Sequence, residues 1–154
     1  MLIQKYDDAE KCLKKAIQFK SDMKEAHNDL IMVLRKKGDN KAALKVCEHA
    51  LKKHDSDDTL HRNKGNILYA MDEAEKALES FEKALDLNPY VVDTWVNKGT
   101  VMWKAMGDRD GALAAFDKAL EINPNFMAAV DSRIALEAEI KANRPSFFKR
   151  LFGG

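Results

Sequence analysis

The chain has 154 residues, of which 45% are hydrophobic and 33% are charged, and its formal net charge is +1 at pH 7. This balance excludes a dedicated nucleic-acid-binding protein, because such proteins need a large excess of Lys and Arg to neutralise phosphates. No run of residues reaches the ~18 consecutive apolar positions that a membrane-spanning helix needs. We therefore expect amphipathic secondary structure, no nucleic-acid partner and no membrane span.

The sequence divides into six consecutive blocks. They comprise residues 1–23, 24–57, 58–91, 92–126, 127–143 and 144–154. The first block carries apolar and small residues at helical spacing (Tyr6, Ala9, Leu13, Ala16) and predicts one amphipathic helix. Each of the next three blocks predicts two antiparallel helices joined by a turn. The fifth predicts a single helix with a polar side, and the sixth breaks the pattern at Pro145.

The third and fourth blocks carry the same residue types at the same offsets. The matched pairs are Gly65 and Gly99, Ala77 and Ala112, Phe81 and Phe116, Ala84 and Ala119, and Pro89 and Pro124. The small residues allow two helix backbones to approach closely, and the phenylalanines bury large apolar area. The prolines end the second helix. The second block follows this pattern more weakly, since it has Ile31 in place of the glycine and Asp55 in place of the proline.

With these residues and a period of 34 or 35, the chain resembles the tetratricopeptide repeat family over residues 4–143. The resemblance implies an all-α, right-handed superhelical solenoid of antiparallel helix pairs. It makes residues 1–23 an N-terminal half-repeat, the next three blocks full repeats, and residues 127–143 a C-terminal capping helix. Because the half-repeat holds only a second helix, we expect an N-terminally truncated array. The half-repeats in register predict seven main helices, and a short helix is expected near Phe147.

The repeat at residues 92–126 has one more residue than its neighbours, between Gly99 and Gly107. An inserted residue is accommodated by a bulge in a helix or by a longer turn. We expect one of these around residues 104–107. The register of Trp103 is open for the same reason.

The residues that most often carry chemistry occur at positions that packing explains. The cysteines and histidines are Cys12, Cys47, His27, His49, His54 and His61. We expect the cysteines to be small, semi-buried hydrophobic residues of a reducing compartment, and the alternative is a metal or disulfide role. His27 and His61 occupy the repeat position that Trp95 holds in the next repeat, so packing explains them. His49 and His54 lie five residues apart on one helix, whereas a spacing of four residues would align both side chains for binding one metal ion. Carboxylate pairs fall at turns or helix starts, where capping explains them. We expect no catalysis, no cofactor and no metal.

Repeat arrays present a surface, and the resemblance implies a concave groove lined by the first helices. The candidate peptide-binding residues are Asn28, Met32, Arg35, Arg62, Asn66, Tyr69, Val96, Asn97, Thr100 and Trp103. An asparagine can bond a peptide backbone with both its donor and its acceptor, and arginine offers a fork to a carboxylate. Tyrosine and tryptophan offer flat apolar contact with a polar tip. The alternative is an ordinary solvated helix face.

One subgroup of the family clamps the acidic C-terminal tails of cytosolic heat-shock chaperones. Arg62, Asn66 and Asn97 match three of its five positions, with arginine for the usual lysine. Ala128 and Ser132 stand at the other two, which are basic in that subgroup. The resemblance to this subgroup is therefore incomplete.

The tail at residues 144–154 is basic and aromatic, with Phe147, Phe148 and Phe152 beside Lys149 and Arg150. Four alternatives are open for this tail: it folds back over the capping helix, it is disordered, it contacts a membrane surface, or it docks on another copy.

For the whole chain, the leading function is a protein-interaction module that binds a peptide or helical segment in the concave groove. The alternative is a self-assembling scaffold that uses the N-terminal helix or the tail. The first residues lack the apolar core of a secretory signal, so we expect a cytoplasmic protein. With the family resemblance we also expect a prokaryotic source.

Overall fold

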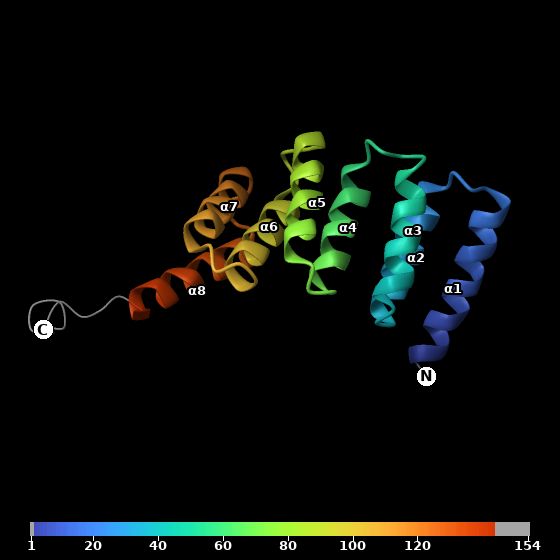
Figure 1. Cartoon of the computed structure of the whole chain (residues 1–154), viewed down its shortest axis with the longest axis horizontal. Coiled ribbons are helices and arrows are strands. Elements are labelled where there is room, and N and C mark those ends of the chain that lie inside the picture. The colour runs from blue at the N-terminus through green and yellow to red at the C-terminus, as the bar shows by residue number, and fades with distance from the viewer. Residues whose placement is uncertain (1, 144–154) are drawn as a thin grey trace, which may run out of the picture.

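The computed structural model describes residues 2–143, which form eight α-helices (Figure 1). These are α1 (Leu2–Phe19), α2 (Lys24–Lys36), α3 (Asn40–Leu51), α4 (Asp58–Tyr69), α5 (Ala74–Leu87), α6 (Val92–Lys104), α7 (Arg109–Ile122) and α8 (Met127–Asn143). The expectation of seven helices was wrong, because the capping helix adds to the seven helices of the half-repeats. The tail and the short helix expected near Phe147 lie outside the described residues.

Within each repeat, the turn between the two helices contains one residue in the left-handed region. These residues are Gly38 (φ 79°), Asp72 (φ 61°) and Gly107 (φ 70°). Glycine adopts this conformation without steric cost, and aspartate tolerates it better than most residues. The left-handed residue reverses the chain within a few positions, so that the second helix runs back along the first.

The hydrogen bond that closes the third turn spans one more residue than in the other two turns. In the first two turns, a backbone N–H bonds to the carbonyl five positions earlier, from Asp39 to Leu34 and from Glu73 to Leu68, both at 2.9 Å. In the third turn, the N–H of Asp108 reaches the carbonyl of Met102, six positions earlier, also at 2.9 Å. The inserted residue of the third repeat is thus taken up in a longer turn, one of the two outcomes that the sequence left open.

The helices form two layers along an elongated array, with α1 at one end and α8 at the other (Figure 1). The first helices of successive repeats touch, α2 with α4, α4 with α6, and α6 with α8. Within residues 2–143, the second helices α3, α5 and α7 make no such contact with one another. The layer of first helices is therefore the more tightly spaced one and lies on the inside of the curve. This confirms the predicted all-α solenoid of antiparallel helix pairs.

The core follows the small and aromatic positions of the repeat. Ala43, Ala77 and Ala112 have no exposed surface, and neither have Phe81 and Phe116. A side chain as small as alanine lets the facing helix approach closely. No helix among the described residues is long and apolar enough to cross a membrane.

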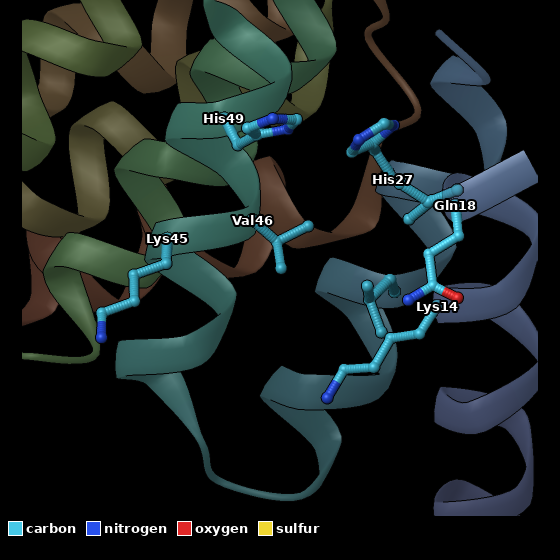
Figure 2. Close-up of a pocket in the computed structure, with 8 residues that line it drawn as sticks. Lys14, Gln18, His27, Lys45, Val46 and His49 are labelled. Atoms are coloured by element: carbon cyan, nitrogen blue, oxygen red, sulfur yellow. The ribbon is translucent and has the colours of Figure 1, made fainter. Parts of the chain in front are cut away.

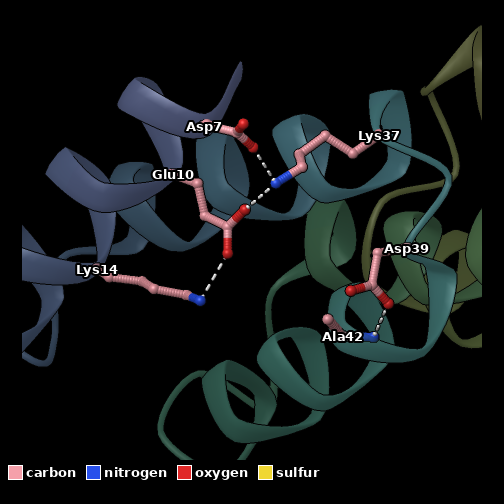
Figure 3. A network of polar contacts seen from close by, with 6 residues as sticks. All are labelled: Asp7, Glu10, Lys14, Lys37, Asp39 and Ala42. Carbon is pink, nitrogen blue, oxygen red and sulfur yellow. Dashed lines mark hydrogen bonds and ion pairs between the residues drawn. The ribbon is translucent and has the colours of Figure 1, made fainter. Parts of the chain in front are cut away.

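Helix α1 contacts only α2 among the described helices. An ion-pair network ties the two together at the end of α2, where Nζ of Lys37 lies 2.6 Å from carboxylate oxygens of both Asp7 and Glu10 (Figure 3). Hydrogen bonds from Lys14 and Lys37 hold the pKa of Glu10 below its usual range. Leu13 packs against the core of the first repeat and stays half-buried. The half-repeat thus docks through both apolar contact and charge.

Candidate binding face on the first helices

The sequence-predicted site residues lie on three neighbouring first helices. Asn28, Met32 and Arg35 belong to α2, Arg62, Asn66 and Tyr69 to α4, and Val96, Asn97, Thr100 and Trp103 to α6. We call this set the concave face. Met32 is 56% exposed, whereas Val96 is only 9% exposed and belongs to the core around Phe116. The other eight are partly buried. Val96 therefore supports the face from beneath and offers little surface of its own.

Asparagine pairs link neighbouring repeats across the concave face. Nδ2 of Asn97 on α6 donates to Oδ1 of Asn66 on α4, at 2.9 Å. Nδ2 of Asn63 on α4 donates to Oδ1 of Asn28 on α2, also at 2.9 Å. Both bonds are partly shielded from water, so each helps to fix the rotation between adjacent repeats. Asn63 is not among the candidate residues that the sequence predicts, because only the tertiary structure brings it opposite Asn28.

The amide groups of each asparagine pair can form further hydrogen bonds besides the one that joins the pair. An asparagine amide has two N–H donors and one acceptor oxygen. In the Asn97–Asn66 pair, the two donors of Asn66 and the oxygen of Asn97 have no partner among residues 2–143. A peptide unit offers one N–H and one C=O. The pair can therefore satisfy both groups of a bound backbone while its own hydrogen bond stays intact.

Two arginines on the concave face form no salt bridge with any carboxylate of residues 2–143. Within the described part of the chain, neither the Arg35 guanidinium nor the Arg62 guanidinium forms a salt bridge with a carboxylate. Burial, and after it the charge of Arg62, hold the pKa of Arg35 below its usual range. The Nε of Arg62 is buried and lacks a hydrogen-bond partner among these residues.

Trp103 lies at the end of the face nearest α8. Its indole N–H donates to Oε2 of Glu139, at 2.9 Å, and its ring meets Phe116 edge-on with centroids 6.5 Å apart. Nζ of Lys104 lies 3.1 Å from the Trp103 ring centroid, in cation–π geometry. Arg109 and then Trp103 hold the pKa of Glu139 below its usual range. The polar tip of Trp103 is therefore occupied within the fold.

Tyr69 and Thr100 complete the face. Tyr69 packs against the core of the second repeat, which includes Leu68 and Phe81. The hydroxyl of Thr100 donates to the carbonyl of Val96 one turn earlier, at 2.8 Å. Its lone pairs still accept, so Thr100 can receive a hydrogen bond from a ligand.

Comparison with family models decides the identity of the array. Models of the tetratricopeptide repeat match residues 3–58, 59–90 and 92–126. The chain is a tetratricopeptide-repeat protein. No curated protein matches its sequence.

Solved structures of other tetratricopeptide-repeat proteins share the fold. MamA is 23% identical, with a TM-score of 0.76 over 87% of this chain and 78% of MamA. YrrB, described as having an unusual peptide-binding site, is 25% identical, with a TM-score of 0.74 over 84% of this chain and 66% of YrrB. The first tetratricopeptide-repeat domain of Spaghetti (RPAP3), bound to the HSP90 peptide SRMEEVD, is 15% identical. Its TM-score is 0.70 over 75% of this chain and 90% of that domain.

Two positions on α8 that are basic in the tail-clamping subgroup are not basic in this tetratricopeptide-repeat chain. Ala128 and Ser132 occupy the two places at which that subgroup has basic residues. Arg133, one residue further, pairs with Asp117 of α7 at 2.6 Å and with Glu137 of α8 at 3.1 Å. It therefore faces the outer layer and does not replace either missing charge.

An apolar depression of about 310 Å³ lies away from the concave face, between α1, α2 and α3 (Figure 2). Its lining includes Ile17, Leu30 and Val46. His27 and His49 stack there with ring centroids 5.9 Å apart. Nδ1 of His27 lies 2.9 Å from the carbonyl oxygen of its own helix start, and Nε2 is buried without a partner among residues 2–143.

Packing explains the surroundings of His27 and Cys47 in this tetratricopeptide-repeat array, whereas the expectation of a semi-buried Cys12 is wrong because Cys12 is exposed. His27 is buried by packing, as its position in the repeat predicts. The thiol of Cys47 is also buried and donates to the carbonyl of Leu60, at 3.2 Å, whereas Cys12 is exposed. Among the described residues, no three His, Cys, Asp or Glu side chains gather where they could hold a metal ion.

Proposed function

We propose that the protein is a non-catalytic interaction module that binds an extended or helical segment of a partner protein on its concave face. The single observation that carries this proposal is the Asn97–Asn66 hydrogen bond of 2.9 Å. It holds two amides in a fixed geometry across neighbouring repeats while leaving donors and an acceptor for a peptide backbone. A cytoplasmic location, as expected from the sequence, is part of the proposal.

Two of the similar structures support a peptide ligand. YrrB is described as a tetratricopeptide-repeat protein with a peptide-binding site, and the RPAP3 domain is bound to an HSP90 peptide. The half-exposed side chains on the concave face offer the same classes of contact that peptides use. Met32 offers adaptable apolar surface, and Tyr69 offers a flat ring.

The test starts with affinity capture by the intact chain, followed by calorimetry with the segment of the captured partner that binds. We expect Asn66→Ala to weaken that segment by about tenfold, which corresponds to ~1.4 kcal/mol. The matched control is Asn125→Ala, in the exposed turn between α7 and α8, which should leave the affinity unchanged. Equal affinities for wild type and Asn66→Ala would contradict binding at the asparagine pair.

Self-assembly through α1 is the second candidate function, and one observation favours it. The side of α1 away from α2 has no neighbour among the described helices. Phe19 at the end of α1 is 93% exposed, and Tyr6, Leu13 and Ile17, which lie on the side toward α2, are only partly buried. Apolar depressions flank α1 on both sides of its contact with α2. A second copy that packed on this end would cover them.

A further inference from the structure

The depression between α1, α2 and α3 contains a buried histidine nitrogen that the fold leaves without a partner. The volume of the depression, about 310 Å³, lies at the lower end of the range for small-ligand pockets. His27 belongs to its lining and is only 1% exposed. The Nε2 atom of His27 is buried and forms no hydrogen bond within residues 2–143. A buried polar atom without a partner costs stability, so this nitrogen calls for an explanation.

The other two repeats use a ring nitrogen at the same repeat position to hold the loop before the first helix. In the second repeat, Nε2 of His61 lies 2.8 Å from the carbonyl oxygen of Asp55. In the third repeat, Nε1 of Trp95 donates to the carbonyl of Pro89, also at 2.8 Å. Each carbonyl belongs to the residue six positions before the ring. The ring nitrogen therefore has a structural role in these two repeats.

In the first repeat, a lysine takes over this role. The carbonyl six positions before His27 is that of Ser21, and it accepts from Nζ of Lys53, at 3.2 Å. Nδ1 of His27 lies 2.9 Å from the carbonyl oxygen of Met23 instead. Because a carbonyl oxygen only accepts, Nδ1 carries the proton, and Nε2 of the neutral ring presents a lone pair. His27 is thus a buried hydrogen-bond acceptor in the lining of the depression.

The rest of the lining is mainly apolar or aromatic. Apolar side chains come from all three helices: Ile17, Leu30 and Val46. The exposed His49 ring stacks with the His27 ring at a centroid distance of 5.9 Å. Lys14 and Lys45 also line the depression, but their ammonium groups point away from the two histidine rings (Figure 2). An ordered water needs two to four polar partners, so these walls suit a ligand that is itself mostly apolar.

We propose that this depression is a second binding site, which takes a Trp or Tyr side chain of a partner protein and accepts a hydrogen bond from its ring N–H or O–H at Nε2 of His27. Both side chains combine a flat apolar ring with one donor, whereas phenylalanine has no donor. They are also enriched among the residues that dominate binding energy at protein interfaces. The site lies away from the concave face, so it goes beyond the proposed function and does not depend on it.

The first experiment titrates the intact chain with N-acetyltryptophanamide and follows the histidine ring nitrogens by NMR. We expect the Nε2 resonance of His27 to shift and saturate, whereas that of His61, which already bonds to Asp55, should stay in place. The same probe methylated on the indole nitrogen has no ring N–H and should bind at least tenfold more weakly. Equal affinities for the two probes, or equal shifts at both histidines, would overturn the proposal.

The second experiment blocks the depression. Val46→Arg should weaken binding of the probe at least tenfold, because the new side chain fills the site. Ala114→Arg places the same side chain on the exposed side of α7 and should bind as the wild type does. His49→Ala removes an exposed ring, so it should weaken binding severalfold at an unchanged melting temperature. If Val46→Arg also lowers the melting temperature, His49→Ala decides, and wild-type affinity in that variant contradicts the site.

Bare indole distinguishes a partner's side chain from a free aromatic compound. We expect N-acetyltryptophanamide to bind at least as tightly as indole, because the backbone of a docked tryptophan leaves the depression. Binding of indole without binding of the capped amino acid would assign the site to a free aromatic molecule and reject the partner side chain. Asn66→Ala, on the concave face, should bind the probe as the wild type does. Failure of the peptide-binding proposal therefore leaves this test unaffected.

Discussion

Phe81 occupies the space in which a side chain at position 65 would lie. A Cβ built on Gly65 would come within 2.6 Å of Cε1 of Phe81, and the same distance separates a Cβ on Gly99 from Cε1 of Phe116. Carbon atoms in contact normally stay ~3.5–4.0 Å apart. In the second and third repeats, the glycine therefore makes room for the aromatic ring of the second helix, in addition to letting the backbones approach.

Gly65→Ala should destabilise the protein even though alanine favours helix. The gain in helix propensity is ~1 kcal/mol, but the displaced ring should cost more, by ~1–3 kcal/mol of overpacking. Urea denaturation of wild type and variant measures the net effect. In a Phe81→Leu background the clash is relieved, so the same glycine substitution should become neutral or stabilising. An equal loss in both backgrounds would show that the ring is not the cause.

Ala112→Leu should lower the melting temperature. Ala112 has no exposed surface and faces the first helix of its repeat, so a larger side chain should cost ~1–3 kcal/mol. Ala114→Leu, on the exposed side of the same helix, is the control and should change little. Differential scanning calorimetry compares the two. Equal melting temperatures would mean that the buried face of α7 is placed incorrectly.

Asp57 should stabilise the protein in a pH-dependent way. Its side chain caps α4 by accepting from the N–H of Leu60, at 2.9 Å, and pairs with Nζ of Lys24, at 2.6 Å. Burial alone would raise the pKa of Asp57, but these hydrogen bonds outweigh it and hold the pKa below the ordinary value of 3.8. The ionised carboxylate therefore adds stability above pH 3.8, and this stability is lost as the pH falls through the lower folded-state pKa.

The variant Asp57→Asn keeps a capping side chain but loses the ion pair. It should be less stable than wild type at pH 7, and the difference should shrink toward pH 2. Asp39→Asn is the matched control, because Asp39 caps α3 from an exposed position and has no salt bridge within residues 2–143. Asparagine caps about as well as aspartate, so this change should be near neutral. Urea midpoints at both pH values give the comparison, and a difference for Asp57→Asn that persisted at pH 2 would contradict the ion-pair explanation.

The two cysteines should react with thiol reagents at very different rates. Burial raises the pKa of the Cys47 thiol to about 12, whereas Cys12 is exposed on α1. Because the thiolate is the reactive species, a colorimetric thiol assay at pH 8 should titrate Cys12 quickly and Cys47 only after unfolding. Cys12→Ser should abolish the fast phase. A fast phase that survived this change would show that Cys47 is accessible.

Self-association should depend on the ends of the array. Sedimentation velocity at micromolar concentration should detect dimers of the intact chain if α1 covers its open side with a second copy. A Phe19→Asp variant should remain monomeric, because Phe19 is 93% exposed on that end. A form that ends at Asn143 tests the tail in the same way. A strictly monomeric intact chain would eliminate the scaffold function and leave the peptide-binding proposal alone.

The extra residue of the third repeat was visible in the sequence as a spacing, and the sequence left open whether it would form a bulge or a longer turn. The choice depends on where Gly107 adopts its left-handed conformation, with φ 70°. That conformation lets the N–H of Asp108 close the turn on Met102. Only the folded helix pair therefore decides between a bulge and a longer turn.

The sequence by itself determined the solenoid, because its signals are local. Small residues, aromatic residues and prolines at fixed offsets in blocks of 34 or 35 residues dictate which helix faces pack and where helices end. The candidate residues of the concave face came from the resemblance to the family, carried over position by position. The periodicity contains no information about how far one repeat rotates against the next.

Only the tertiary structure decided what those residues do. The hydrogen bonds between Asn97 and Asn66, between Asn63 and Asn28, and between Trp103 and Glu139 each join residues more than thirty positions apart. Such contacts depend on the rotation between repeats and on side-chain rotamers. Both are set by the summed packing of many buried side chains, a property of the whole array that no single repeat encodes.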